Sequence, residues 1–241
     1  FLKIPYLMHE QNSFPGIVTK IFSKNAKMVF LGFENAANYL NKSNMLFTGN
    51  PVLLKDSAKI NLKLNNELKT LLIFGGSQGS KVINHVIASL LEKKLIKNLN
   101  VVWIVGEKNY ETFKSFNKNN VNVLGYCNSM SQIYELSNLA ITRSGAMTIS
   151  ELIKFKLPAI LIPFRYSSEN HQLFNAQFLK NNGCSELIEE EELNEDLILK
   201  SIDEICLNEN IEKRMVSNFN KIEIPNSLSI ISRFIEDNYA S

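Results

Sequence analysis

The feature of this sequence that most restricts its fold is the alternation of short apolar segments with patterns of helical spacing. The apolar segments lie at residues 71–74, 101–105, 121–124, 139–141 and 158–163. Helical patterns separate them, such as the one formed by Val82, Ile83, Val86, Ile87 and Leu90. Strands that alternate with helices at this spacing form β-α-β units and a parallel sheet. We therefore predict an α/β fold in which the loops after strands 71–74, 121–124, 139–142 and 159–163 lie along one edge.

The bulk properties exclude several classes of protein. The chain has 241 residues, enough for one large or two small domains, and its 45% hydrophobic and 21% charged residues are ordinary for a globular protein. The net charge of +2 is too small to argue for a nucleic-acid partner. The three cysteines, at positions 127, 184 and 206, match no metal-binding spacing and are typical of reduced thiols in the cytoplasm. No apolar run approaches a membrane span, and no part of this sequence is expected to act as a signal peptide. Because Phe1 leads directly into an apolar run, we interpret the chain as part of a longer protein.

The segment from Thr142 to Glu151 carries the clearest functional signal. It joins a buried strand to a helical pattern, so Ser144 and Gly145 are predicted to lie at a strand-to-helix turn. The first N–H groups of a helix have no partner inside it, and the dipole is positive there, which suits a phosphate. Glu151 follows about 9 Å along the helix axis, roughly the distance from a pyrophosphate to the ribose of the same nucleotide. We infer either a nucleoside diphosphate site or an ordinary capped helix with a surface glutamate.

Two other loops at strand ends are rich in glycine or polar residues. Loop 75–80 (GGSQGS) precedes a helix but matches neither G-x-G-x-x-G nor the P-loop pattern. It is expected either to contact a phosphate or sugar, or to let helix and strand pack closely. Loop 9–16 follows a strand predicted at residues 1–8 and is either ligand-facing or an ordinary polar loop before a helix beginning near Pro15. Since these loops converge on one crevice, a ligand site is favoured over separate packing roles.

The remaining patterns predict the domain boundary and the C-terminal part. Residues 48–52 are rich in turn formers and mark a domain boundary. In the helix after loop 164–172, Gln172 and Asn175 are expected to share the exposed start. The run 189–192 is interpreted as a solvated helix approach and not as a metal site. Residues 194–219 are predicted to be helical. The last pattern predicts an amphipathic helix that packs on the protein through Leu228, Ile231 and Ile235.

Five motifs, in the same order, resemble the MurG family of bacterial UDP-N-acetylglucosamine transferases, which complete lipid II for peptidoglycan. They are HEQNSFPG at 9–16, TGNPV at 48–52, GGSQGS at 75–80, RSGAMTISE at 143–151 and HQLFNA at 171–176. The resemblance implies a GT-B fold, in which two Rossmann-like domains face a cleft. It implies that residues 1–50 end the acceptor and membrane domain, that 55–222 form the UDP-N-acetylglucosamine donor domain, and that a helix in 223–241 returns toward the first domain.

The resemblance also assigns roles to individual residues. Asn12 is expected to meet the donor sugar from the acceptor side, Ser77 to line the diphosphate region, and the Cys127 backbone to meet uracil. The phosphates would lie against Gly145, Ala146, Met147 and Thr148, with the ribose on Glu151. Gln172, with Asn175 nearby, would read the sugar hydroxyls. His9 and Glu10 are weak candidates for the catalytic base. No cofactor and no metal are implied.

The implied reaction is an inverting transfer of N-acetylglucosamine to the muramyl sugar of lipid I. It would occur in the bacterial cytoplasm, with the enzyme peripheral on the inner membrane and contributing to cell-wall synthesis, cell shape and division. Two departures from the family pattern are visible. The glycine-rich loop with a histidine that opens family members is absent, and so is most of the membrane-docking domain. Leu53 stands where an arginine usually follows the GNPV motif, with Lys55 nearby.

Three alternatives stay open at this point. The chain could be a different GT-B enzyme, such as a UDP-N-acetylglucosamine 2-epimerase, although the HEQN and RSGA motifs argue against it. It could bind a UDP-sugar without catalysis, because only the donor half is nearly whole. It could also be a structural α/β domain without a ligand.

Overall fold

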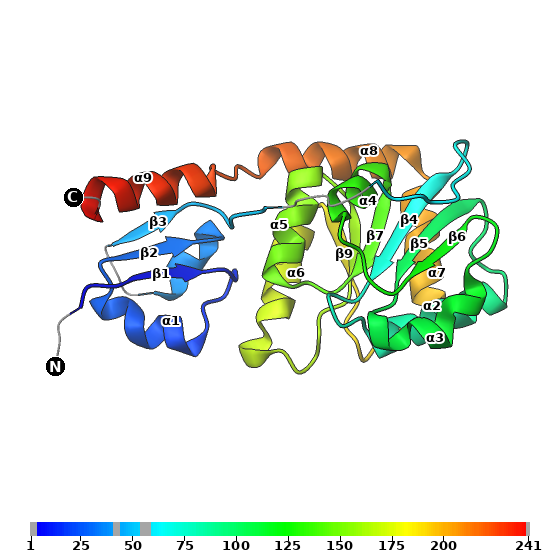
Figure 1. Ribbon diagram of the computed structural model, residues 1–241, viewed down its shortest axis with the longest axis horizontal. Helices are drawn as coiled ribbons and strands as arrows, with labels where there is room; N and C mark the ends of the chain where they lie inside the picture. The colour runs from blue at the N-terminus through cyan, green and yellow to red at the C-terminus, as the bar shows by residue number, and fades with distance from the viewer. Residues whose placement is uncertain (1–3, 41–43, 54–58, 240–241) are drawn as a thin grey trace.

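The computed structural model describes residues 4–40, 44–53 and 59–239. Within these residues the strands form two parallel sheets, which lie toward opposite ends of an elongated molecule (Figure 1). The smaller sheet is built from residues before position 50 and the larger one from residues after position 68. The prediction of an α/β fold with parallel sheets is therefore confirmed.

The smaller sheet has the order β1-β2-β3, with β1 (Leu7–Glu10), β2 (Met28–Leu31) and β3 (Met45–Phe47). The helix α1 (Ile17–Phe22) connects β1 to β2. The strand predicted at residues 1–8 instead begins at Leu7, because Pro5 has no N–H to donate to a strand ladder; residues 1–3 lie outside the described part. The strand extends to Glu10, which pairs with Leu31 of β2, so His9 and Glu10 lie in the strand and not in the following loop. The helix expected near Pro15 begins at Ile17.

The larger sheet has the order β6-β5-β4-β7-β8-β9, and every neighbouring pair is parallel. Its strands are β4 (Lys69–Phe74), β5 (Leu99–Ile104), β6 (Val121–Leu124), β7 (Leu139–Thr142), β8 (Ala159–Leu161) and β9 (Ser185–Leu187). The chain builds outward from β4 to β6 on one side, then returns to the centre and builds outward from β7 to β9. The strand order thus reverses between β4 and β7. In open α/β sheets, ligands bind at the carboxyl ends of the strands beside such a reversal.

Helices cover both faces of the larger sheet (Figure 1). One face carries α2 (Lys81–Glu92), α3 (Tyr110–Phe113) and α7 (Glu195–Cys206), and the other carries α4 (Met130–Leu136), α5 (Ala146–Phe155) and α6 (His171–Asn181). Alternate residues of β4 enter the two cores: Leu71 and Ile73 enter one, and Leu72 and Phe74 enter the other. Because both faces are covered, the strands are nearly continuous apolar runs, which is why the sequence reveals them.

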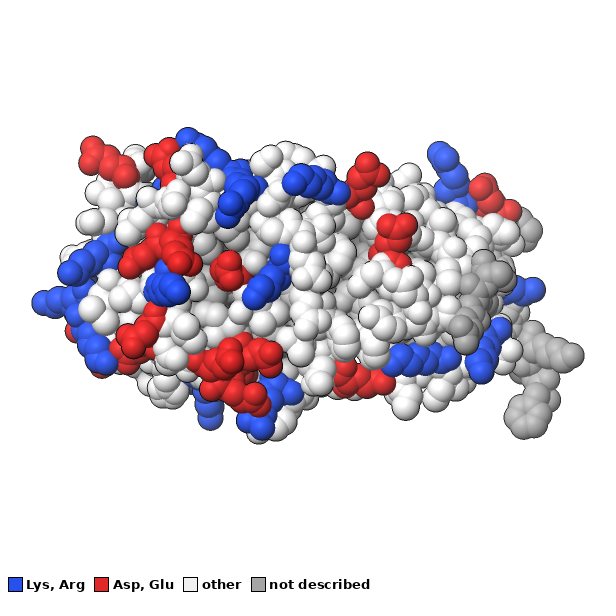
Figure 2. Space-filling model, turned by 180° about the vertical axis from the view of Figure 1, so that it is seen from behind, with Lys and Arg blue, Asp and Glu red and all other residues white. Residues whose placement is uncertain are grey.

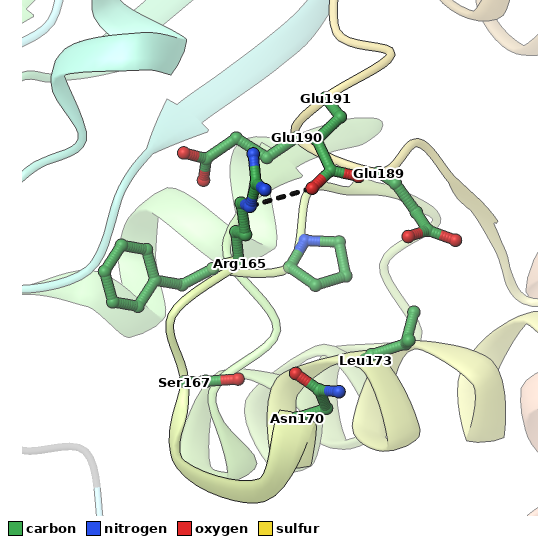
Figure 3. Close-up of a pocket in the computed structure, with 9 residues that line it drawn as sticks. Arg165, Ser167, Asn170, Leu173, Glu189, Glu190 and Glu191 are labelled. Carbon is green, nitrogen blue, oxygen red and sulfur yellow. Dashed lines mark ion pairs between the residues drawn. The ribbon is translucent and has the colours of Figure 1, made fainter.

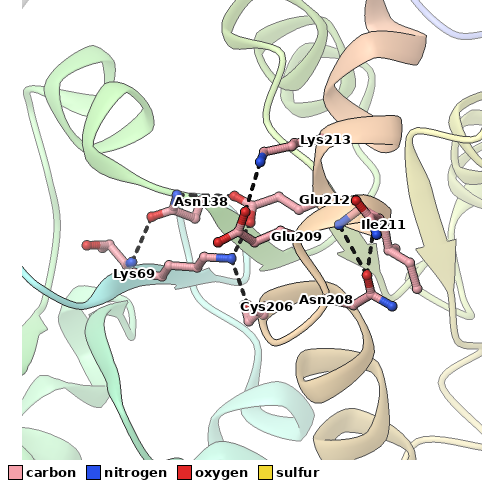
Figure 4. A network of polar contacts seen from close by, with 10 residues as sticks. Lys69, Asn138, Cys206, Asn208, Glu209, Ile211, Glu212 and Lys213 are labelled. Carbon is pink, nitrogen blue, oxygen red and sulfur yellow. Dashed lines mark hydrogen bonds and ion pairs between the residues drawn. The ribbon is translucent and has the colours of Figure 1, made fainter.

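The region predicted as one helical stretch, 194–219, is divided into α7 and α8 (Glu209–Asn218). Asn208 lies at the junction, where its side chain accepts hydrogen bonds from the N–H groups of Asn210 and Ile211 and so starts α8. Lys69, at the start of β4, donates to the Cys206 carbonyl at 2.7 Å and pairs with Glu212 (Figure 4). This polar network fixes the junction against the sheet, on the side away from the carboxyl ends of the strands.

The terminal helix α9 (Ser227–Tyr239) lies along the smaller sheet (Figure 1). The ring of Phe234 packs edge-on against Phe30 of β2, with 5.3 Å between centroids. The prediction that this helix packs on the protein is confirmed, but the predicted face is partly wrong. Leu228 and Ile235 are 42% and 43% exposed, because the helix turns Phe234 toward the sheet.

The described residues include no helix that is both long and apolar enough to cross a membrane. In the same part of the chain, no group of three or more His, Cys, Asp or Glu side chains is placed to hold a metal ion. Acidic and basic side chains are interspersed on the face shown in Figure 2, as the small net charge suggests.

Candidate functional site

A cavity of about 300 Å³ lies at the carboxyl ends of β4 and β5, on the side of the strand-order reversal. The residues that line it come from the ends of β4 and β5, loop 75–80, the segment after β6, α4 and the first two turns of α5. They are Phe74, Gly76, Ser77, Ile104, Tyr126, Cys127, Met130, Tyr134, Met147, Thr148 and Glu151. Five residues proposed from the sequence, Ser77, Cys127, Met147, Thr148 and Glu151, are therefore brought together on one cavity.

The N-terminus of α5 is open beside this cavity. Gly145 is the N-cap residue in an extended conformation, the helix proper begins at Ala146, and no side chain among the described residues caps it. The first intrahelical bond from this end runs from the Ile149 N–H to the Gly145 carbonyl at 3.0 Å. The preceding N–H groups, up to Thr148, therefore remain available to an anion, and the helix dipole favours a negative charge there.

The turn before α5 is held rigidly from the α6 side. Ser144 is fully buried, and its hydroxyl donates to the Gln172 carbonyl at 2.7 Å. Asn175 Nδ2 donates to the Ser144 carbonyl at 3.1 Å. Two side-chain hydrogen bonds between this turn and α6 therefore fix the position of the α5 N-terminus.

Loop 75–80 contains glycines that permit close packing and residues that line the cavity. A Cβ on Gly75 would lie 2.2 Å from the Ser80 nitrogen, and one on Gly79 would lie 2.0 Å from the Val105 carbonyl oxygen, so these two glycines permit close packing. A Cβ on Gly76 would have no neighbour within 4 Å in the described part of the chain, and Gly76 lines the cavity. Packing therefore explains Gly75 and Gly79, whereas Gly76 and Ser77 border the space for a ligand.

Glu151 projects from the second turn of α5 and is half-buried on the cavity wall. The Tyr134 hydroxyl donates to its Oε2 at 2.8 Å. Burial raises the pKa of Glu151 above its usual value, although the Tyr134 hydrogen bond and the charge of Lys154 oppose that shift. Burial, followed by the Glu151 charge, raises the pKa of Tyr134 well above its usual value, so Tyr134 is a neutral donor.

We expect the affinity for a uridine nucleotide to fall on acidification because of Glu151. The ionised carboxylate accepts hydrogen bonds best, and its raised pKa means that it takes up a proton at a less acidic pH than an ordinary glutamate. The contribution of Glu151 to affinity should be constant above this pKa and decrease as the pH falls through it. Titration calorimetry over a pH series, with the same series on Glu151→Gln, isolates this contribution from the titration of the ligand phosphates. Parallel curves for the two proteins would contradict the prediction.

Arg143 is a buried residue to which the sequence assigned no role. It is 8% exposed, and its guanidinium donates to the carbonyls of Ile162 and Pro163, both at 3.1 Å, and to the Ser80 hydroxyl at 2.9 Å. It also forms an ion pair with Glu190. Arg143 thus joins the ends of β7 and β8 to the end of loop 75–80. It therefore connects the segments on the two sides of the strand-order reversal.

A second hollow, of about 270 Å³, lies between loop 163–170 and the acidic run (Figure 3). Arg165 Nε pairs there with Glu191 Oε1 at 2.8 Å. The prediction of a solvated acidic run holds for Glu189, Glu191 and Glu192, which are exposed. It is wrong for Glu190, whose side chain is 14% exposed because it turns inward to Arg143.

Loop 9–16 is arranged around the Glu10 carboxylate. Glu10 is 5% exposed and accepts from the N–H groups of Asn12 and Gly16 at 3.0 and 3.1 Å and from the Asn12 amide at 3.3 Å. His9 Nε2 lies 3.3 Å from the Gly49 carbonyl, and burial lowers the pKa of His9. Leu53 is 64% exposed, and Lys55 lies outside the described residues.

Asn175 joins this loop to the α5 turn. Its Oδ1 accepts from the Ser13 N–H at 2.9 Å, and its Nδ2 donates to Asn12 Oδ1 at 3.1 Å. The expectation that Asn175 lies at an exposed helix start is wrong: it is fully buried, because these bonds draw it between the two regions. Gln172 Oε1 accepts from the Phe164 N–H at 2.9 Å. Asn12, Gln172 and Asn175 are thus gathered around the Ser144 turn and not along the 300 Å³ cavity.

The comparisons with known proteins identify the family. The glycosyltransferase family 28 C-terminal domain matches residues 70–228. A relative from Acetivibrio thermocellus, named UDP-N-acetylglucosamine–N-acetylmuramyl-(pentapeptide) pyrophosphoryl-undecaprenol N-acetylglucosamine transferase, is 34% identical, with 98% of this chain and 67% of the relative aligned. The relative of the same name from Carboxydothermus hydrogenoformans is 36% identical with the same coverage. The chain belongs to the MurG family. The resemblance stated from its motifs is therefore confirmed.

Solved structures show the same fold. The crystal structure of Acinetobacter baumannii MurG has a TM-score of 0.80 and 24% identity, over 97% of this chain and 68% of that one. The calicheamicin glycosyltransferase CalG4 has a TM-score of 0.64 at 10% identity, over 93% of this chain and 59% of that one. The prediction of a GT-B fold is thus confirmed. A putative UDP-N-acetylglucosamine 2-epimerase from Listeria monocytogenes also shares the fold, with a TM-score of 0.68 at 12% identity over 98% of this chain and 69% of that one. Fold alone therefore does not separate MurG family members from epimerases.

Proposed function

We propose that this chain binds UDP-N-acetylglucosamine in the 300 Å³ cavity and transfers N-acetylglucosamine to the muramyl sugar of lipid I, giving lipid II. The observation that supports this best is the open N-terminus of α5 on the same cavity wall as Glu151. The diphosphate would accept from the N–H groups of Ala146, Met147 and Thr148. The ribose hydroxyls would donate to Glu151, and the uracil would lie toward Cys127.

In this proposal, the main catalytic contribution is electrostatic. As the bond from C1 of N-acetylglucosamine to the diphosphate breaks, negative charge grows on the leaving UDP. The fixed amide dipoles at the α5 N-terminus stabilise that charge without having to reorganise. Residues around the Ser144 turn, with Gln172 and Asn12 in reach of it, would orient the sugar for in-line attack by the acceptor hydroxyl.

The two candidate bases differ in their availability. The Glu10 carboxylate already accepts three hydrogen bonds within its own loop, which suits a positioning role. His9 is the other candidate: burial lowers its pKa, which favours the neutral imidazole that can accept a proton. Asn175 supports the site by holding Asn12 and the Ser144 turn in register.

The domain assignment and setting are part of the same proposal. Residues 1–50 would end an acceptor domain, 55–222 would form the donor domain, and 223–241 would join the two; residues 55–58 lie outside the described part. The enzyme would work on the cytoplasmic face of the bacterial inner membrane, on a lipid-linked acceptor, in cell-wall synthesis needed for cell shape and division. The chain spans about two thirds of the length of the relatives from Acetivibrio thermocellus and Carboxydothermus hydrogenoformans.

Calorimetry with UDP-N-acetylglucosamine, followed by a transfer assay with a lipid I analogue, tests the proposal. We expect saturable one-to-one binding and formation of a lipid II analogue. Binding without transfer would support a UDP-sugar-binding chain without catalysis, and conversion of the sugar nucleotide in the absence of acceptor would support the epimerase alternative. No binding of either UDP or UDP-N-acetylglucosamine would overturn the proposal.

A further inference from the structure

Tyr134 is a buried tyrosine whose hydroxyl the proposed reaction does not use. It lies on α4, is 2% exposed and contributes to the wall of the 300 Å³ cavity. Its ring stacks on Phe155 at 5.2 Å between centroids and meets Phe74 edge-on at 6.0 Å. Because the aromatic neighbours come from the end of β4 and the end of α5, the ring is fixed to both the sheet and the helix that carries Glu151.

The one polar atom of this side chain reaches Glu151. The hydroxyl donates to Oε2 at 2.8 Å, and no other described residue donates a hydrogen bond to that carboxylate. A glutamate has three rotatable bonds, so a carboxylate on a half-buried cavity wall needs a fixed partner to keep one direction. With Oε2 held by Tyr134, Oε1 and the remaining lone pair of Oε2 are left for two hydroxyl donors.

We propose that Tyr134 is a positioning residue that holds the Glu151 carboxylate in the orientation needed to bind a pair of ribose hydroxyls. This inference rests on the proposed uridine diphosphate site. It adds that the Tyr134–Glu151 hydrogen bond makes the site prefer ribonucleotides over nucleotides without ribose hydroxyls. Tyr134 acts only through Glu151, so its contribution appears only with ligands that carry the 2′ and 3′ hydroxyls. Phenylalanine at this position preserves the ring packing and removes only the donor.

Calorimetry with two ligands, UDP and 2′,3′-dideoxy-UDP, tests this inference on the wild type, Tyr134→Phe and Tyr6→Phe. Tyr6→Phe is the matched control, since it removes a hydrogen bond of 2.7 Å from a tyrosine hydroxyl to the Phe22 carbonyl, outside the cavity. We expect Tyr134→Phe to weaken UDP about fivefold to tenfold, the net effect of one hydrogen bond, and to change dideoxy-UDP less than about twofold. Tyr6→Phe should change neither.

The other possible results distinguish a failure of this inference from a failure of the proposed function. Equal losses for both ligands would show that Tyr134 acts through general packing, and no loss would show that Glu151 keeps its direction without it. Either result overturns this inference while leaving the nucleotide site intact. Failure of the wild type to bind UDP would overturn both this inference and the proposed function. Thermal unfolding of Tyr134→Phe near the wild-type temperature confirms that the variant is folded.

Discussion

Replacement of Glu151 with alanine is expected to weaken binding of UDP and UDP-N-acetylglucosamine about 5-fold to 150-fold, or roughly 1–3 kcal/mol. The substitution removes a carboxylate that would accept two hydrogen bonds from the ribose, and bonds to a charged group are worth more than neutral ones. Because Glu151 is half-buried on α5, truncation also leaves the Tyr134 hydroxyl without its partner. Titration calorimetry at neutral pH measures this effect directly.

Two further variants make the Glu151 result specific. Glu151→Gln keeps the shape and one acceptor but loses the charge, so its affinity should lie between those of the wild type and Glu151→Ala. Glu204→Ala removes an exposed carboxylate of α7 and should bind as the wild type does. Unchanged affinity in Glu151→Ala would remove this residue from the ribose role.

Replacement of Arg143 with alanine should cause the largest loss of stability among the residues around the site. The guanidinium is 8% exposed and holds two carbonyls, the Ser80 hydroxyl and Glu190. Removing one partner of a buried ion pair leaves an uncompensated charge, which typically costs about 3–5 kcal/mol. For a chain of this size that corresponds to a decrease in Tm of roughly 6–20 °C. Thermal and urea unfolding measure the change.

The double variant Arg143→Met/Glu190→Met separates the ion pair from the rest of the site. Without either charge, much of the lost stability should return, because no buried carboxylate is left unpaired. Arg143→Lys should be intermediate, since lysine keeps the charge but not the planar fork that reaches several acceptors. A loss below about 1 kcal/mol in Arg143→Ala, the level of an exposed pair, would contradict the role given to Arg143 here.

The fold was largely accessible from the sequence because both faces of the larger sheet are covered. Strands such as β4 and β7 are then uninterrupted apolar runs, and the helices between them carry a clear period. The errors have two causes: local signals that the hydrophobic pattern does not contain, and contacts between residues distant in the sequence. Asn208 caps the start of a new helix, and β1 begins after Pro5 and not at residue 1. Neither residue changes the hydrophobic pattern. Which face of α9 packs on the smaller sheet depends on the contact between Phe234 and Phe30, two residues that are distant in the sequence.

The candidate site was predicted only in part, because local spacing and motifs reveal some of its residues and not others. The α5 turn, Ser77 and Glu151 follow from local spacing and from the motifs of the MurG family, and the structure places Ser77, Cys127, Met147, Thr148 and Glu151 on one cavity. Tyr134 and Arg143 were missed, because their roles depend on partners that come from other elements. For Arg143, the one available signal was its position between an apolar strand and a glycine turn. Arginine is rarely buried unless it is paired, so an arginine at such a position indicates several acceptors nearby.

The measurement that tests the central claim most directly is a crystal structure of the protein with UDP bound. We predict that the diphosphate lies within hydrogen-bond distance of the N–H groups of Ala146 to Thr148 and that both ribose hydroxyls donate to the Glu151 carboxylate. A nucleotide bound elsewhere, with Glu151 turned into solvent, would contradict it.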